Sequence, residues 1–235
     1  MIRKLLIVFA SGLVLATVLL SAAWIVGGQE LMARVKKGPT VLVGVSSDLP
    51  PSATRTLPFD GAQMLTIDAP VSLKFIRGPK SEMTITGPEA VLAALEWKDG
   101  RLSLNDKAPT VRKMLKVTIS APQIAGLVFS GAGDADLDNL DQSALTLDLS
   151  GAANIDASGK VARLDVSASG VGDIDLSRLE AGDAAVKLPG AGAIDLAATG
   201  AVDVEVSGAG SVTLHRRPAN LTSRISGLGS IDHDY

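Results

Sequence analysis

One set of carboxylates recurs at a fixed distance along the second half of the chain. Each lies six positions after the first residue of a Ser-Gly-Ala-Gly motif or a close relative of it. The set is Asp136, Asp156, Asp175, Asp195 and Asp232, with Thr213 at the fifth place. If these residues stack, their charges can be relieved by solvation, by raised pKa values or by a bound cation such as calcium. We expect a solvated acidic face, with a metal-binding ladder as the alternative.

A local calcium loop is the sharper form of that alternative. Asp134, Asp136 and Asp138 have the spacing with which such a loop begins. The loop also needs a glycine at its sixth position and a bidentate glutamate at its twelfth. This chain has Asn139 and Leu145 there, so the match fails.

Few other residues could carry out chemistry. The chain has no cysteine and two histidines, which excludes a thiolate nucleophile, a disulfide framework and a cysteine-based zinc site. His215 precedes Arg216 and Arg217, which predicts a solvated loop or, less simply, an anion-binding patch. His233 is expected to be an exposed residue near the chain end. No lysine followed by serine or threonine comes after the glycines, so they do not form a phosphate loop. We predict no catalytic and no cofactor-binding residue.

The elements that must position these side chains are repeats. The six motifs begin at Ser130, Ser150, Ser169, Pro189, Ser207 and Ser226, at intervals of 20, 19, 20, 18 and 19 residues. Apolar residues alternate with polar ones before each motif, as in Leu145, Leu147 and Leu149, and the alternation resumes after it. This period of two is typical of a strand with one buried face. Each repeat is therefore predicted to be strand, glycine corner, strand and polar loop.

A repeat of this length is typical of one coil of a parallel β-helix, whereas a propeller blade needs about 40–45 residues. We predict an all-β, single-stranded parallel β-helix with ~19-residue coils. A four-stranded meander is the alternative. The third motif position is expected to point inward; it is occupied by Ala132, Ala152, Val171, Ala191, Ala209 and Leu228. The looser β-pattern of residues 54–125 is expected to supply the first coils and a cap.

The amino-terminal segment has the pattern of an export signal. Arg3 and Lys4 precede an uncharged run from Leu5 to Gly28. Residues 5–26 are long enough to span a bilayer as a hydrophobic helix, which favours an uncleaved anchor over a cleaved signal. We predict a signal anchor or signal peptide at 1–28, a linker at 29–53 and the β-helix domain at 54–235. The remainder would face the periplasm or the outside, membrane-anchored or, if cleaved, soluble.

Several segments, taken in their order along the chain, resemble a known family. They are 55–61, which opens the domain, then 78–89, 98–104 and 115–122, followed by the glycine motifs. In this order they resemble the head GIN domain family of auto-transporter adhesins over roughly residues 54–235. The resemblance implies a right-handed β-helix exported into the bacterial envelope. It implies no catalytic or binding residue.

We therefore expect a non-enzymatic envelope protein, an adhesin-like or scaffolding β-helix with a repetitive acidic surface. A carbohydrate-active enzyme on a β-helix and a calcium-stabilised structural module are the alternatives. The net charge of -3 disfavours nucleic acid as a partner. An envelope protein or polysaccharide could bind, and exposed end coils could pair between copies.

Overall fold

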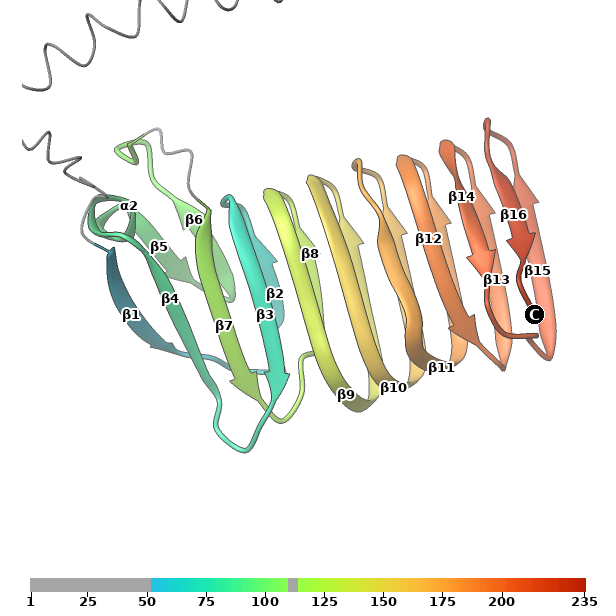
Figure 1. Ribbon diagram of the computed structural model, residues 1–235, viewed down its shortest axis with the longest axis horizontal. Helices are drawn as coiled ribbons and strands as arrows, with labels where there is room; N and C mark the ends of the chain where they lie inside the picture. The colour runs from blue at the N-terminus through green and yellow to red at the C-terminus, as the bar shows by residue number, and fades with distance from the viewer. Residues whose placement is uncertain (1–51, 110–113) are drawn as a thin grey trace, which may run out of the picture. The chain divides into compact units, whose positions relative to one another are not determined.

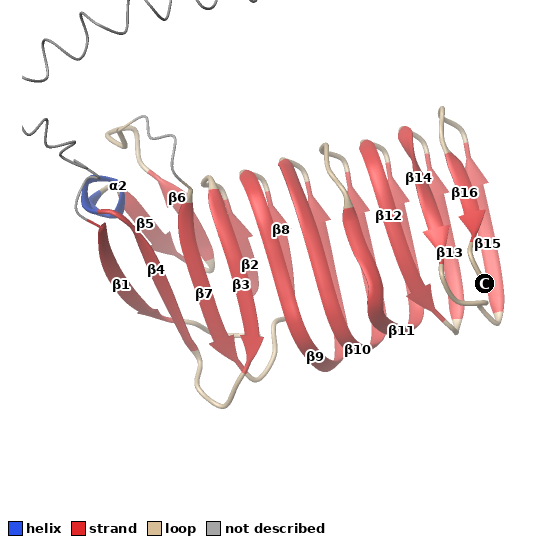
Figure 2. Ribbon diagram, in the orientation of Figure 1, coloured by secondary structure: helices blue, strands red, loops and turns tan. Residues whose placement is uncertain are grey.

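The computed structural model describes residues 52–109 and 114–235. The predicted anchor or signal at 1–28, its hydrophobic helix and residues 29–51 of the predicted linker lie outside the described residues. Within the described part, no helix is long and apolar enough to cross a membrane. One short helix, α2 (Glu89–Ala93), accompanies sixteen strands in a single hydrogen-bonded sheet (Figures 1 and 2).

The repeats form a β-solenoid of about five turns, as predicted. Its three longest strands are β9 (Ala132–Leu149), β10 (Ala152–Ala168) and β11 (Ile174–Leu188). They stack in parallel, and β10 pairs with β9 on both sides of a bend near Asn139, where the register shifts by one residue. The later turns are built from β12 (Ala191–Ala198), β13 (Ala201–Val206), β14 (Ala209–Leu214), β15 (Asn220–Ile225) and β16 (Ser230–His233).

The solenoid has two flat walls. The aspartate wall, so called below, consists of the first halves of β9, β10 and β11 followed by β12, β14 and β16. The opposite wall consists of the second halves of β9, β10 and β11 followed by β13 and β15. The apolar alternation buries the inner positions of both walls, such as Leu147 and Ile155. No polar or charged residue of the described part is buried.

The glycine corners lie directly above one another. The amide of Val171 donates to Gly151 O at 2.9 Å, and that of Ala191 donates to Gly170 O at 3.0 Å. A Cβ on Gly170 would overlap Gly151 O, so only glycine permits this separation between coils. The stacked corners exclude the meander.

The expected direction of the third motif position is wrong. Val171 is 62% exposed and Leu228 is 91% exposed. The alternation continues through the corner, so the third position points outward and the fourth, as at Gly133 and Ala153, points inward. The close approach of backbones restricts the second position, as at Gly170, and the width of the core does not restrict the third position.

The amino-terminal part supplies coils in an order that differs from the sequence. Its parallel strands are β2 (Met64–Ile67), β3 (Val71–Arg77), β6 (Arg101–Leu104), β7 (Leu115–Ala121) and β8 (Gly126–Phe129). The coil of β2 and β3 comes first in the sequence, yet it lies between the coil of β6 and β7 and that of β8 and β9.

Residues 54–125 supply the first coils and a cap, as predicted, and the cap is antiparallel. Three further strands pair antiparallel there: β1 (Ser52–Pro58), β4 (Glu82–Pro88) and β5 (Leu95–Lys98). β1 lies at the edge beyond β4, and α2 packs its own Val91 and Leu92 against the core. These elements close this end of the solenoid, as a cap must.

Candidate functional site: an aspartate ladder

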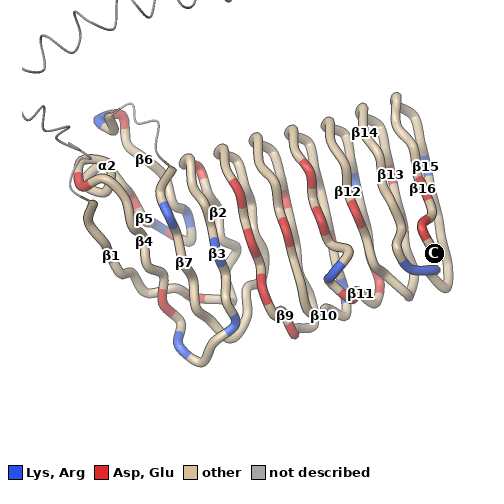
Figure 3. The backbone as a smooth tube through the Cα atoms, in the orientation of Figure 1, with Lys and Arg blue, Asp and Glu red and all other residues tan. Residues whose placement is uncertain are grey.

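The predicted aspartates form one column across the aspartate wall. Asp136 pairs in register with Asp156, Asp156 with Asp175, and Asp175 with Asp195. Thr213 follows, and Asp232 ends the column. Acidic segments recur on successive coils in Figure 3. Since adjacent strands lie about 4.8 Å apart, the column is a ladder of carboxylates with that spacing. We call these five aspartates the aspartate ladder.

Side chains of the same wall contact individual carboxylates of the ladder. Arg178 lies 3.3 Å from Asp156, from its guanidinium Nη2 to the carboxylate Oδ1. Asp175 accepts from the hydroxyl of Ser177 at 2.6 Å and from its amide at 2.9 Å. Asp136 has no ion-pair partner among the residues that the structure describes. The ladder therefore combines engaged carboxylates with a free one.

The middle of the ladder does not relieve its charge by protonation. The hydroxyl of Ser177 lowers the pKa of Asp175, against the opposing effect of partial burial. The Ser177 amide and the nearby charges of Arg178 and His215 lower this pKa further. Asp175 is therefore a carboxylate at neutral pH.

His215 connects the ladder to the chain end. Its Nε2 lies 2.7 Å from Asp195 Oδ1, and its Nδ1 lies 3.3 Å from Asp234 Oδ2. The hydrogen bond to Asp195 raises the pKa of His215, partial burial opposes this, and the charges of both aspartates raise it further. Two flanking carboxylates make this a poor anion site. His215 lies in the loop between β14 and β15, as predicted, but its side chain is half-buried and contacts both aspartates.

Sequence reasoning missed the role of His215, although a signal was present. Asp195, His215 and Asp234 follow one another at intervals of 20 and 19 residues, which is one coil each. Residues separated by about one coil lie on neighbouring coils of a solenoid, so the repeat length brings these three side chains near one another. It does not predict their contact, because the register partner of Asp195 is Thr213 and His215 lies two residues beyond it. His233 is exposed near the end, as predicted, and its Nδ1 lies 3.2 Å from the hydroxyl of Tyr235.

A second ladder, at the corner between the walls, balances its charges. Arg77 contacts Asp141 at 3.0 Å. Lys160 contacts Glu180 at 3.1 Å, and Arg216 reaches the other oxygen of Glu180 at 3.8 Å. Opposite charges alternate here along the axis, which is the arrangement expected of a structural ion-pair network. The aspartate ladder repeats one sign and lacks this alternation.

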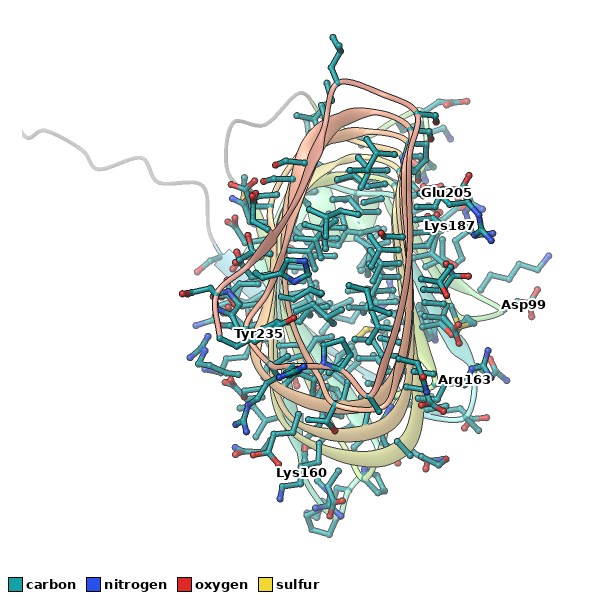
Figure 4. The ribbon with its side chains drawn as sticks, turned by 90° about the vertical axis from the view of Figure 1, so that its right-hand side faces the viewer. Asp99, Lys160, Arg163, Lys187, Glu205 and Tyr235 are labelled. Carbon is teal, nitrogen blue, oxygen red and sulfur yellow. The ribbon has the colours of Figure 1, made fainter. Side chains whose placement is uncertain are left out.

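The opposite wall carries two shallow hollows. One has a volume of about 320 Å³ and is lined by residues including Arg163, Asp203 and Thr222. The other has a volume of about 210 Å³, and Ala185 lines both. The short side chain of Ala185 leaves space between longer polar ones in adjacent coils. Lys187, Glu205 and Arg163 project from this wall in Figure 4, on the side away from Tyr235.

No three acidic or histidine side chains of the described part are grouped so that they could hold a metal ion. Carboxylates that stack along a flat wall point outward side by side, whereas a calcium site needs oxygens that converge on one point. The ladder geometry therefore gives the calcium alternative no support.

Comparisons with known proteins place the fold. A search of the curated proteins finds no relative of this chain. A crystal structure of a putative adhesin from Bacteroides fragilis is 26% identical, with a TM-score of 0.64, and the match covers 78% of this chain and 97% of that one. A putative adhesin from Parabacteroides merdae is 17% identical, with a TM-score of 0.46 and coverage of 77% and 95%.

The family model of the "Putative auto-transporter adhesin, head GIN domain" matches residues 63–218. These residues include the amino-terminal coils and most of the glycine corners on which the resemblance depends. The chain belongs to this adhesin-head family.

Proposed function

We propose that this protein is a non-enzymatic, adhesin-like component of the cell envelope. The aspartate ladder carries the proposal, because a rigid wall holds its carboxylates in a regular array. The described residues support the absence of catalysis. His215 lies between two aspartates, His233 lies beside Tyr235, and the Ser177 hydroxyl donates to Asp175.

The ladder suits a cationic partner. Carboxylates about 4.8 Å apart act together on a surface with several positive groups, so contacts that are weak singly add up. We infer that the partner is a basic protein or a cationic polysaccharide of the envelope. The family name fits an envelope or extracellular protein. Residues 5–26 would anchor the chain so that the solenoid faces the extracytoplasmic side, with cleavage to a soluble form as the alternative.

Retention of the full-length chain on isolated bacterial envelopes tests this proposal. One variant carries Asp136→Asn, Asp156→Asn and Asp175→Asn. We expect it to bind roughly threefold to a hundredfold more weakly than the native chain, because each exposed pair contributes about 0.2–1 kcal/mol. Binding by the native chain should also weaken with added salt, which screens exposed charges.

A matched control changes three aspartates of the opposite wall: Asp148→Asn, Asp165→Asn and Asp183→Asn. It alters the net charge equally and removes similar contacts. Asp165 pairs with Arg163 at 3.2 Å as Asp156 pairs with Arg178, and Asp183 accepts from the Ala201 amide at 2.8 Å as Asp175 accepts from that of Ser177. Unchanged binding by the control assigns the effect to the ladder. Equal loss of binding in both variants would show that the effect depends only on the net charge of the chain.

The hollows of the opposite wall favour a second candidate function, recognition of a neutral polar chain such as a glycan. Guanidinium, carboxylate and hydroxyl groups line the larger hollow and can exchange hydrogen bonds with sugar hydroxyls. In this case the control variant would lose binding and the ladder variant would keep it. Release of sugar products during the same incubation would contradict the non-enzymatic proposal.

A further inference from the structure

The last coil leaves core positions uncovered. On the opposite wall, Leu221 and Ile225 of β15 pair in register with Val202 and Val206 of β13. The two valines are 2% and 0% exposed, whereas Leu221 is 38% and Ile225 is 50% exposed. The inward positions of this coil therefore have the residue type of a core and lack a covering layer. Figure 4 looks onto this end, with no further coil in front of it.

The same coil leaves two strand edges open. Within the described part, β15 pairs with β13 alone and β16 pairs with β14 alone. Each outer edge presents backbone amides and carbonyls that another extended strand can satisfy. The two edges lie on opposite walls, with apolar side chains between them. The complementary surface must therefore offer two strand edges around an apolar centre.

A second copy of this chain offers such a surface at one end only. At its amino-terminal end β1 and β5 also pair on one side only, but α2 packs buried side chains over the core there, and β1 carries Pro58, which has no amide hydrogen to donate. Its carboxy-terminal end has the two open edges and the same apolar residues. The fit is therefore between two carboxy-terminal ends related by a two-fold axis, in which one patch meets itself.

The charges at the carboxy-terminal end are compatible with its pairing with the same end of a second copy. Arg217 and Asp232 have no ion-pair partner among the described residues, and they belong to the last turn of the solenoid. Two-fold symmetry presents each copy with both signs, so opposite charges can pair across the contact. An end of one sign would repel its copy.

We propose that the chain forms a tail-to-tail homodimer, in which the edges of β15 and β16 pair with those of a second copy. The apolar side chains of both open coils then form one covered layer. The dimer carries two aspartate ladders on one rigid body, which raises the avidity for a partner with repeated positive groups.

The mass of the full-length chain in detergent, measured by native mass spectrometry, tests the dimer. We expect twice the mass of one chain. Leu221→Lys with Ile225→Lys adds positive charge to the open coil and should return the mass to that of a single chain. Both side chains are already exposed in one copy, so the β-sheet circular dichroism of this variant should persist.

A matched control places the same changes elsewhere. Met64 and Val171 are 37% and 62% exposed and lie away from the last coil. Met64→Lys with Val171→Lys should leave the dimer intact. A native chain that remains monomeric, or a control that dissociates equally, would overturn the proposal.

A second measurement keeps the site testable if the lysine variant fails to fold. The chain has no cysteine, so one introduced cysteine takes one spin label. Ser226→Cys labels the open end and Thr54→Cys labels the capped end. We expect a short distance between copies from position 226 and none from position 54. The reverse result would place the contact at the amino-terminal end and overturn the proposal.

Discussion

At the scale of single residues, His215 is the side chain that links the chain end to the neighbouring coils. It joins three successive coils, because Asp195 precedes it by one coil and Asp234 follows it by one. The amide of His215 donates to Leu196 O at 2.8 Å, and that of Asp234 donates to Leu214 O at 2.9 Å. Backbone and side chain therefore hold the chain end against the same two coils.

This contact predicts how stability depends on pH. The folded pKa of His215 is raised above the ordinary value of about 6.5. Its protonation therefore stabilises the fold fully below about pH 6.5, and the stabilisation is lost as the pH rises through the raised pKa. We expect the melting temperature of the native chain to fall more between about pH 6 and about pH 9 than that of His215→Asn.

The control for this pH series is His233→Asn, which changes the other histidine. It should retain the pH dependence of the native chain. Thermal melts followed by circular dichroism at matched ionic strength measure the difference. Equal pH dependence in the native chain and His215→Asn would show that the two aspartates do not stabilise the charged imidazole.

At the scale of elements, the glycine corner is the part of each coil that tolerates least change. Successive corners approach so closely that a side chain on one glycine would meet the carbonyl oxygen of the glycine in the preceding corner. The neighbouring third position is free of this restriction because it points outward, as Val171 does. A substitution at the corner glycine should therefore destabilise the fold more than one at the third position, which is the next residue in the chain.

Gly170→Ala tests that contrast. Its Cβ would meet Gly151 O, and relieving the overlap requires the backbone to shift. We expect a loss of about 1–3 kcal/mol in the free energy of unfolding, as for other overpacked sites. Val171→Ala should change this free energy by less than about 0.5 kcal/mol. Urea unfolding of both variants measures the two values, and equal losses would contradict close packing at the corner.

At the scale of the whole molecule, the two ends of the solenoid differ. Antiparallel strands and a short helix cap the amino-terminal end, whereas the carboxy-terminal end exposes core positions and two strand edges. In solenoids, each coil contacts only its neighbours, so stability accumulates coil by coil and an uncovered end is the weakest part. A partner at that end would stabilise the whole stack.

Metal removal tests whether the stack depends on cations. The outward carboxylates of the ladder bond to Arg178, Ser177 and His215, and they do not converge on one point. We therefore expect the melting temperature of the full-length chain to be the same in EDTA and in excess calcium. A calcium-dependent rise that saturates would restore the calcium-stabilised module, because a ligand that binds only the folded state raises its stability.

The sequence alone determined the coil. The interval of about nineteen residues, the alternation and the glycine corners predict a stacked parallel structure, and that stack puts Asp136, Asp156, Asp175 and Asp195 in one column. The turn between β5 and β6 is equally local: it consists of Asp99 and Gly100, and both adopt the positive φ that such hairpin turns need. These features are local or periodic, so each repeat carries its own signal.

Only the tertiary structure decided the order of the first coils, the antiparallel cap and the position of His215 between two aspartates. A strand signal shows that a segment pairs, but it does not say with which partner. The insertion of β2 and β3 between later coils depends on contacts between distant segments. The predicted inward direction of the third motif position was wrong for a related reason. Small residues suit both a narrow core and a close contact between backbones, and only the tertiary structure distinguishes these two causes.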